Sequence, residues 1–257
     1  MITRKELESI ARSVGFNSYQ AEKDYLQHAL LATLYEVSTN EFVFKGGTAL
    51  QKVFGLDRFS EDLDFTYLSD KDPMEFIEKT TDKLEILGIF AEMNATKIER
   101  KNDSFTVRIK IKGPLYDGSE KSIQTITIEL SLREEPIKTP IAKRIVPIYP
   151  DLRPYVVLCM DLDEMLAEKI RAIMTRGKPR DVYDLWFMLK KNAKFNEEYV
   201  NKKLLFYGKK FRYTEFNKQI KKNKDKWWDE LSLLIRNPPT FVEIYKEIKN
   251  IMKIRLK

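Results

Sequence analysis

The chain has 257 residues, of which 43% are hydrophobic and 33% are charged. Because it shows no apolar run of about 18 residues and no apolar N-terminal segment, membrane-spanning and secreted classes are disfavoured and a cytoplasmic protein is expected. One cysteine, Cys159, excludes an internal disulfide, and one histidine, His28, leaves no material for a Cys/His zinc site. Any catalysis is therefore expected to use carboxylates, lysine and a hard metal ion.

The net charge of +7 is distributed unevenly along the chain. Residues 1–160 carry 22 Lys and Arg against 25 Asp and Glu, whereas residues 161–257 carry 24 against 14. An acidic first part with a basic second part suits a metal-dependent site beside a surface that binds a polyanion such as RNA. Lysines outnumber arginines, however, so a generally Lys-rich proteome is an alternative explanation.

The first forty residues are predicted to be helical. Thr3 is placed to cap a short helix, and a longer helix after Ser18 carries Leu26, Leu30 and Leu34 on one apolar face. His28 lies off that face, which is typical of an ordinary surface or helix-contact histidine.

Strand patterns dominate the next part of the chain. Extended segments are predicted at residues 42–45, 62–67, 105–111 and 126–131, with short helical stretches at 48–54 and after Pro73. From about Leu162 onward only helical periods remain. The sequence therefore predicts an α+β fold with two domains, residues 1–160 around a mixed sheet with flanking helices and residues 161–257 as a basic helical bundle.

A pair of carboxylates marks the second extended segment. On a strand, residues two apart face the same side, so Asp62 and Asp64 are expected to project together while Leu63 and Phe65 enter the core. Two adjacent carboxylates repel each other unless they are solvated or share a divalent cation, and Mg²⁺ favours one or two carboxylates together with substrate phosphates. The pair is a candidate metal site, although exposed pairs of this kind are also common by chance.

Two further features support that interpretation. Gly46 and Gly47 lie between a strand and a helix start, where backbone N–H groups and the helix dipole can receive phosphate. A tight turn that needs glycine is the simpler alternative. Glu129 offers a third carboxylate on the polar face of a later strand, and three such groups could hold two metal ions.

The helical half has its own candidates. Lys169 falls inside an apolar stripe, where an ammonium needs a partner, a ligand or a route to solvent, and Arg176 lies two turns later on the same side. Pro179 opens the next helix, in which Asp181 and Asp184 share a face. The helix dipole alone would stabilise acids at this position.

Two blocks of sequence resemble a known family. The run KGGTALQKVFGLDRFSEDLDF at residues 45–65 resembles the phosphate-binding glycine motif and metal-binding D-x-D of the polymerase-beta-like nucleotidyltransferase superfamily. Together with AEKIRAIMTRGKPRDVYDL at residues 167–185, it is similar to the AbiEii/AbiGii toxin family. Thr48 stands where the wider superfamily usually has serine. The resemblance implies a nucleotidyltransferase-fold head followed by a helical domain, in toxins of toxin–antitoxin and abortive-infection systems.

The resemblance also implies roles for individual residues. Asp62 and Asp64 would bind Mg²⁺ or Mn²⁺, with Glu129, which is placed by its strand pattern and not by the motifs, as the third carboxylate. An acid of the last motif would orient Lys169 or accept a hydroxyl proton. The implied catalytic residues are Asp62, Asp64, Lys169, Asp181 and Asp184. The implied nucleotide-binding residues are Lys45, Gly46, Gly47, Thr48, Arg58, Ser60, Lys169, Arg176 and Arg180.

The expected function is metal-dependent transfer of a nucleoside monophosphate from an NTP to an acceptor hydroxyl. RNA is the expected acceptor, in particular the 3′ end of tRNA, and an antitoxin is a possible partner. Lysines and aromatic residues are interspersed after residue 190, which suits RNA binding, although helix packing explains many of the aromatics. A protein side chain as acceptor, or a non-catalytic NTP-binding or RNA-binding module, are the alternatives.

Overall fold

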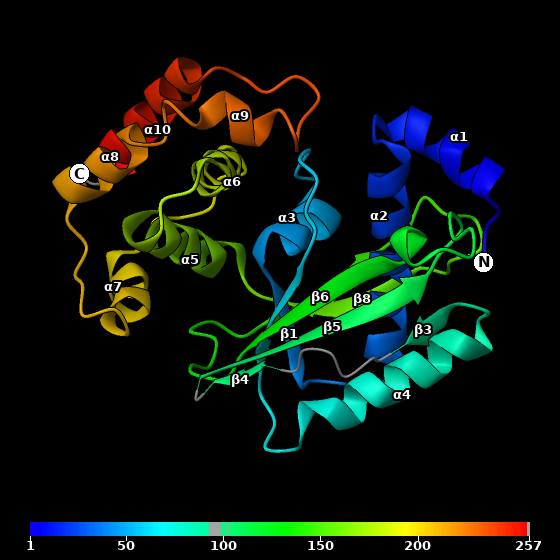
Figure 1. Cartoon of the computed structure of the whole chain (residues 1–257). Coiled ribbons are helices and arrows are strands. Elements are labelled where there is room, and N and C mark those ends of the chain that lie inside the picture. Colours follow the sequence, from blue (N-terminus) through cyan, green and yellow to red (C-terminus); the bar gives the residue numbers. More distant parts are fainter. Residues whose placement is uncertain (93–98, 102, 256–257) are drawn as a thin grey trace. The chain divides into compact units, whose positions relative to one another are not determined.

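The computed structural model describes residues 1–92, 99–101 and 103–255, which divide into two compact units (Figure 1). The first unit comprises residues 1–55, 59–136 and 140–159, and the second comprises residues 56–58, 137–139 and 160–257. Two short segments from the first part of the sequence therefore belong to the later helices. The predicted domain boundary at residue 160 stays a prediction.

A mixed eight-stranded sheet forms the centre of the first unit, in the order β3–β5–β6–β2–β1–β8–β7 with β4 paired to β5. The strands are β1 Phe42–Lys45, β2 Leu63–Tyr67, β3 Phe90–Glu92, β4 Glu99–Lys101, β5 Ser104–Lys112, β6 Gln124–Ser131, β7 Ile141–Ile145 and β8 Tyr155–Cys159. β1 pairs antiparallel to β2 and parallel to β8, and β2 pairs parallel to β6. The predicted mixed sheet with flanking helices is confirmed.

The two faces of the sheet differ in polarity. Along β5 every second residue from Phe105 to Ile111 is buried and the residues between them are half-buried, and β6 shows the same alternation from Gln124. Helices α2 (Ser18–Val37) and α4 (Pro73–Ile86) pack against each other, α2 also contacts β6 and β8, and α4 contacts β3. The apolar side chains of the sheet thus join the core with these helices.

Helix α2 differs from the sequence prediction. Its N-cap Asn17 and the first helix α1 (Arg4–Val14), capped by Thr3, both form capping boxes. Residues 21–31 are all buried, however, so α2 has no solvent-facing side in this stretch and the predicted single apolar face is wrong. The physical reason is that α2 lies between α1, α4 and the sheet.

Element boundaries agree closely with the prediction in the central motif. Helix α3 runs Gly46–Phe54, two residues longer at its start than predicted, and β2 begins at Leu63 rather than at Asp62. Strands β7 and β8 were not predicted. β7 lacks regular alternation of buried and exposed residues, and its only strand partner among the described residues is β8.

The second unit is helical. Its helices are α5 Leu162–Thr175, α6 Pro179–Lys190, α7 Glu197–Leu205, α8 Tyr213–Lys221, α9 Trp227–Leu231 and α10 Phe241–Arg255. α5 is capped by Asp161, and α6 begins with Pro179 in its first turn as predicted. Helix α5 packs against α6, α7 and α8, while α6 packs against α9 and α10. Across the described part of the chain, no helix combines the length and the apolar character needed to cross a bilayer.

Candidate functional site

The turn between β1 and α3 brings backbone very close to a carboxylate. Gly46 has φ +77°, a left-handed backbone conformation that residues other than glycine rarely adopt. A Cβ built at Gly46 would collide with the carboxylate of Asp64. α3 starts without a side-chain cap from Lys45, so its first N–H groups are not satisfied by that residue. Glycine is therefore required here twice, for the backbone conformation and for space.

A row of four residues crosses the sheet at this level. Lys45 of β1 is in register with Asp64 of β2, Asp64 with Glu129 of β6, and Glu129 with Thr106 of β5. Residues in register on adjacent strands point to the same face. Lys45 is buried, Asp64 is half-buried and Glu129 is exposed. The structure thus places two of the three predicted metal-binding carboxylates side by side with a lysine next to them.

Asp62 is placed by a different set of contacts, since it precedes β2. The hydroxyl of Thr48 donates to the Asp62 carbonyl at 2.5 Å. The fully buried Gln27 donates to the carbonyls of Ser60 and Glu61 at 3.0 and 2.8 Å. The side-chain oxygen of Gln51 accepts from the Ser60 N–H at 3.1 Å.

We call these three side chains, Thr48, Gln27 and Gln51, the loop clamp. They come from α2 and α3 and fix the backbone that leads into the D-x-D pair. Sequence analysis missed Gln27 and Gln51. Gln51 lies inside the motif, but the sequence pattern gives no signal for Gln27, which is 33 residues from its partner Ser60.

A buried polar network lies behind the loop clamp. Asp24 of α2 accepts from Gln51, from the ammonium of Lys52 at 2.7 Å, and from the hydroxyl of Tyr149 at 2.9 Å. Burial raises the pKa of Asp24, but the attraction of Lys52 and His28 and the hydrogen bonds from Lys52 and Tyr149 together outweigh it and leave the pKa below its usual value. Asp24 therefore stays ionised and ties α2 to α3.

His28 belongs to the same network and is buried, which excludes the surface position and agrees with the helix-contact position, the two alternatives expected from the sequence. Its Nδ1 lies 2.8 Å from the hydroxyl of Tyr155, and its Nε2 lies 3.6 Å from Asp24. Burial, and then repulsion by Lys52, lowers the pKa of His28 to about 3. The imidazole is therefore neutral near pH 7 and has a packing role.

The carboxylates can accept a divalent cation, although they do not form a complete cage. No cluster of three or more Asp, Glu, His or Cys side chains with metal-binding geometry occurs within residues 1–92, 99–101 and 103–255. The residues still fit Mg²⁺, because Mg²⁺ binds to one or two carboxylates and completes its shell with waters and substrate phosphates. The absence of a Cβ at Gly46 lets the Asp64 carboxylate lie directly against the start of α3.

The second unit contains a buried ionic cluster. The ammonium of Lys169 lies 3.1 Å from Asp181 and 2.6 Å from Asp184, both of which are fully buried. Arg58 binds Asp184 through two nitrogens, at 2.5 and 2.7 Å, and Arg176 binds Asp181 through two nitrogens, at 3.0 and 2.9 Å. Three cations thus share two carboxylates.

The ionisation of this cluster follows from those contacts. Burial raises the pKa of Asp181, and attraction to Lys169 and Arg176 overcomes it, so its pKa is well below the usual value. For Asp184 the attraction of Arg58 and Lys169 likewise outweighs burial and lowers the pKa. Carboxylates held ionised by two cations each are poor proton acceptors. Of the two roles expected for these acids, orienting Lys169 fits the geometry better than accepting a hydroxyl proton.

Arg176 is the most accessible cation of the cluster, with half of its side chain exposed, whereas Arg58 is buried. Tyr183 adds a hydrogen bond to Asp57 at 2.6 Å, which with Arg58 holds the segment 56–58 in the second unit. Arg180 is not part of the cluster. It pairs with Glu230 at 3.8 Å.

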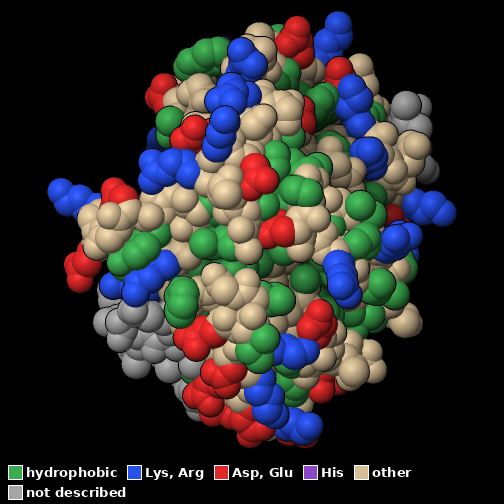
Figure 2. Space-filling model, turned by 90° about the vertical axis from the view of Figure 1, so that its right-hand side faces the viewer, with side chains coloured by type: hydrophobic (Ala, Val, Ile, Leu, Met, Phe, Trp, Pro, Cys, Tyr) green, Lys and Arg blue, Asp and Glu red, His purple; other side chains and the backbone are tan. Residues whose placement is uncertain are grey.

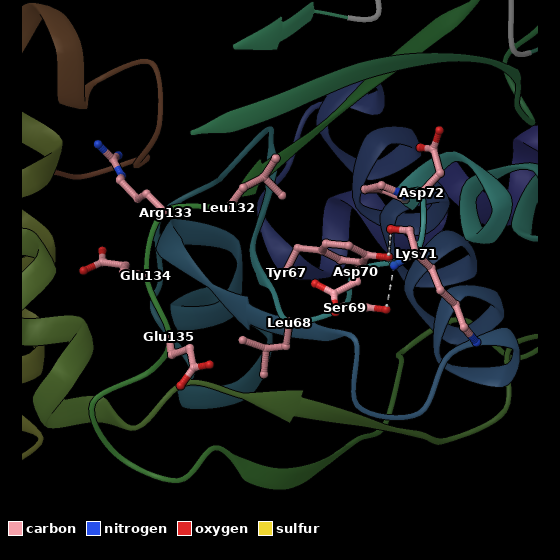
Figure 3. A pocket seen from close by; sticks show the side chains of 11 residues that line it. Tyr67, Leu68, Ser69, Asp70, Lys71, Asp72, Leu132, Arg133, Glu134 and Glu135 are labelled. Carbon is pink, nitrogen blue, oxygen red and sulfur yellow. Dashed lines mark hydrogen bonds between the residues drawn. The ribbon is translucent and has the colours of Figure 1, made fainter. Parts of the chain in front are cut away.

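A pocket of about 580 Å³ lies at the C-terminal ends of β2 and β6 (Figure 3). In Figure 3 the ring of Tyr67 points toward Lys71, whose carbonyl accepts from the Tyr67 hydroxyl at 2.9 Å. The charged residues of the lining are Asp70, Lys71, Asp72, Arg133, Glu134 and Glu135. Four acids against two bases make this pocket a poor site for phosphate, and none of the predicted site residues lines it.

Comparison with known proteins identifies the family. A family profile described as the nucleotidyl transferase AbiEii toxin of a type IV toxin–antitoxin system matches residues 29–247. The chain belongs to this family. It is a nucleotidyltransferase, and the resemblance seen in its motifs is confirmed. No curated protein matches the chain in a sequence search.

Solved structures share the fold. MenT4, a nucleotidyltransferase toxin from Mycobacterium tuberculosis H37Rv, superposes with a TM-score of 0.68 at 19% identity, covering 98% of this chain and 88% of that one. JHP933 from Helicobacter pylori superposes with a TM-score of 0.58 at 19% identity, covering 91% and 90%. At this identity the AbiEii-type fold is what the three proteins have in common.

Proposed function

We propose that this AbiEii-family chain transfers a nucleoside monophosphate from an NTP to the 3′-terminal hydroxyl of an RNA, specifically a tRNA. The row Lys45–Asp64–Glu129 beside the uncapped start of α3 is the observation that carries the proposal. It combines the two things the reaction needs, hard oxygen ligands for a cation and backbone donors for phosphate.

Asp62, Asp64 and Glu129 would hold Mg²⁺ or Mn²⁺. When bound, the metal supplies charge neutralisation at the reacting phosphate and at the attacking and leaving oxygens. The loop clamp fixes the backbone of Asp62, and the register of β2 and β6 fixes Asp64 beside Glu129. These side chains are therefore held in place before a metal or nucleotide arrives.

The triphosphate is proposed to bind at the start of α3. The N–H groups of Gly46, Gly47 and Thr48 form the positive end of the dipole of α3. The ammonium of Lys45 adds a positive charge at the same level of the sheet. The Thr48 hydroxyl already donates to the Asp62 carbonyl, so its N–H is the group offered to phosphate. Ser60 contributes only its clamped backbone.

Cations of the second unit are proposed to bind phosphate as well. Lys169 and Arg176 belong to a cluster of three cations and two carboxylates, and Arg176 exposes half of its side chain. Asp181, Asp184 and Arg58 would keep Lys169 in position. Arg180 is half-buried against Glu230 and is proposed only as a more peripheral nucleotide contact.

The biological setting is inferred from the family. A type IV toxin–antitoxin description supports an antitoxin as functional partner, and we propose the cytoplasm as the place of action. The excess of 24 Lys and Arg over 14 Asp and Glu in residues 161–257 supports an RNA acceptor.

Incubation of the purified chain with each α-labelled NTP, total cellular RNA and Mg²⁺ tests this proposal. We expect label from one or a few NTPs at the 3′ ends of small RNAs, and loss of labelling with EDTA. Labelled protein and unlabelled RNA would instead establish a protein acceptor. NTP binding without any transfer would contradict the proposed reaction, and the control Asp64→Asn should remove labelling while the protein stays folded.

A further inference from the structure

The polar face of strands β5 and β6 carries a line of cations that the proposed reaction does not use. Strand alternation places Thr106, Arg108, Lys110 and Lys112 on the face opposite to the buried Phe105, Val107, Ile109 and Ile111. Arg108 is in register with Thr127 of β6, and Lys110 with Thr125. These side chains are all half-buried, so they form a partly accessible surface of hydroxyls and cations.

This surface starts at the carboxylate row. Thr106 precedes the cations on the polar face of β5. It is in register with Glu129, and Glu129 is in register with Asp64. Residues on one face of a strand follow each other at about 7 Å. Arg108 therefore lies about 7 Å along β5 from the level of Glu129, and Lys110 about 14 Å.

The chemistry of the transfer indicates from which side the acceptor approaches. The acceptor oxygen forms a bond to the α-phosphorus while the bond from that phosphorus to the bridging oxygen breaks. Pyrophosphate leaves with the electron pair, and the hydroxyl proton passes to water. Attacking and leaving oxygens lie roughly in line on opposite sides of the phosphorus.

The order of strands then separates the two oxygens. α3 follows directly on β1, and across the sheet come Asp64 on β2, Glu129 on β6 and finally β5. If pyrophosphate lies at the start of α3, the acceptor hydroxyl has to approach from the side of Glu129. The line of cations on β5 lies on that side.

We propose that the polar face of β5 and β6 binds the single-stranded 3′ end of the RNA acceptor, with Arg108 and Lys110 on its phosphates. This inference rests on the function proposed above. Thr125 and Thr127 offer hydroxyls to the sugar–phosphate backbone on the neighbouring strand. Sequence-independent contacts of this kind suit an acceptor end that is read by shape and charge.

Arg108 shows an incomplete set of partners that fits this role. Its side chain is 40% exposed, and its Nη1 atom makes an ion pair with Glu99 at 3.7 Å, a separation too long for a strong hydrogen bond. That Nη1 atom is buried and has no hydrogen-bond partner among the described residues. On the exposed part of the side chain, a phosphate would provide the short, charge-assisted contacts that Glu99 does not. An acidic protein segment is the competing occupant. It lacks the regularly spaced phosphates of an RNA strand, which the evenly spaced cations of β5 would contact.

The double variant Arg108→Gln, Lys110→Gln tests the proposal. We expect its dissociation constant for a short single-stranded oligonucleotide with a free 3′ hydroxyl to rise roughly tenfold at low salt. The slope of log K against log salt should fall by about 1.4, since each lost contact to a single strand contributes about 0.7. NTP binding should stay unchanged, because Asp62, Asp64 and α3 are not altered.

Two controls separate charge from general damage. The exchange Arg108→Lys, Lys110→Arg keeps both charges and should bind the oligonucleotide almost as well as wild type. The variant Lys79→Gln, Lys121→Gln removes two exposed lysines elsewhere in the first unit and should leave both affinity and slope unchanged.

The outcomes distinguish this inference from the proposed function. Equal affinity and slope for wild type and Arg108→Gln, Lys110→Gln, with RNA labelling intact, would overturn the β5–β6 surface alone. An acceptor RNA with 4-thiouridine near its 3′ end should cross-link to residues 104–112 or 124–131, and exclusive cross-links to residues 160–257 would overturn it too. Wild-type protein that neither binds nor labels any RNA would overturn both proposals.

Discussion

Gly46 shows how a single residue limits what the site can contain. Gly46 and Gly55 have nearly the same left-handed conformation, with φ +77° and +76°, but their surroundings differ. A Cβ at Gly46 meets the Asp64 carboxylate, whereas a Cβ at Gly55 meets nothing within 4 Å. The two glycines therefore separate the effect of backbone strain from the effect of space beside a proposed metal ligand.

Replacement of these glycines by alanine should have different consequences. Both variants should lose about 1–2 kcal/mol of unfolding free energy from the left-handed backbone. Gly46→Ala should in addition displace Asp64 and lower transfer by at least about tenfold, which is about 1.4 kcal/mol of transition-state stabilisation. Thermal unfolding and transfer assays on both proteins provide the measurement. Equal activity of Gly46→Ala and Gly55→Ala would show that the Asp64 cradle does not matter for the reaction.

The carboxylates themselves predict a separation of activity from stability. Asp62→Asn and Asp64→Asn should both abolish detectable transfer. The unfolding free energy of Asp62→Asn should stay equal or rise, because removing one of two neighbouring charges relieves repulsion when metal is absent. Asp64→Asn should instead cost stability, because Asp64 lies beside the buried Lys45. The exposed Asp82 on α4 offers a matched control, and Asp82→Asn should change neither quantity. Wild-type transfer rates in the Asp64 variant would remove it from the site.

His28 gives the chain a defined dependence on pH. Its folded-state pKa of about 3 lies below the ordinary value, so its contribution to stability is complete above about pH 6.5 and is lost as the pH falls toward the folded pKa. Because His28 is the only histidine, the unfolding free energy should fall by up to about 1.4 kcal/mol per pH unit as the pH drops from 6 to 5. Urea unfolding measures it, and a slope that His28→Gln does not reduce would contradict the neutral, buried imidazole.

Lys169 also has a structural role that the sequence did not reveal. It was predicted from its place in an apolar stripe, and the structure shows that it neutralises two fully buried carboxylates together with Arg58 and Arg176. Lys169→Ala leaves Asp181 paired with Arg176 and Asp184 paired with Arg58, so it should destabilise the second unit by about 1–3 kcal/mol, the cost of the charge-assisted hydrogen bonds that it removes. Asp184→Asn should lower the unfolding free energy by more, about 3 kcal/mol or more in thermal unfolding, because it leaves the buried Arg58 and Lys169 without that carboxylate. A Lys169→Ala protein as stable as wild type would show that the cluster does not depend on the ammonium.

At the level of elements, the loop clamp is the feature that connects packing with the proposed chemistry. Gln27 donates to two carbonyls in the segment before Asp62, although Asp62 itself lies outside the sheet ladder. Gln27→Met keeps the volume but removes both bonds. We expect it to raise the Mg²⁺ concentration needed for half-maximal activity and to lower kcat at least about tenfold. The affinity for NTP should change little.

A second buried glutamine provides the control for that variant. Gln124 is also nearly fully buried but contacts Tyr19, remote from the clamped segment in the sequence. Gln124→Met should cost about 1–3 kcal/mol of stability without altering the Mg²⁺ dependence. The same Mg²⁺ titration curve for wild type and Gln27→Met would show that Gln27 only fills the core.

The elements that could be predicted from sequence are those with strong local patterns. β1, β5 and β6 alternate or form compact apolar runs, and Pro73 and Pro179 mark helix starts, so all of these were located correctly. β7 was missed because it lacks alternation, and β8 because its exposed and buried positions are both occupied by apolar residues. β3 and β4 were missed as well, since each has only three residues. The register of Asp64 with Glu129, and the contacts of Gln27, depend on residues 65 and 33 positions apart, and local patterns contain no information on such pairs.

For the whole molecule, net charge alone does not identify the RNA surface. On the face shown in Figure 2, Lys and Arg side chains are intermingled with Asp and Glu side chains. The exposed Lys221, Lys222 and Lys224 remain the densest series in the second unit, and Trp228 beside them in sequence is 62% exposed. The buried Phe216 and Trp227 are core residues, so only some of the aromatics are available for stacking.

Charge reversal of those three lysines to glutamate should weaken RNA binding and reduce its salt dependence. The slope of log K against log salt should fall by about 2 if all three contact a single strand. The triple reversal at Lys5, Lys79 and Lys121, exposed in the first unit, controls for the change in net charge. Filter binding across a salt series measures both, and equal slopes for the two triple variants would mean that Lys221, Lys222 and Lys224 are a solvated face.

The central claim is that the carboxylates of β2 and β6 direct transfer of one nucleotide unit from an NTP to RNA. The most direct measurement counts pyrophosphate released and label incorporated in the same reaction, for wild type, Asp64→Asn and Glu129→Gln, with and without EDTA. We predict one pyrophosphate for each nucleotide added to an RNA 3′ end by wild type, and neither product from Asp64→Asn or with EDTA. Equal pyrophosphate release and labelling by Asp64→Asn and wild type would contradict the account.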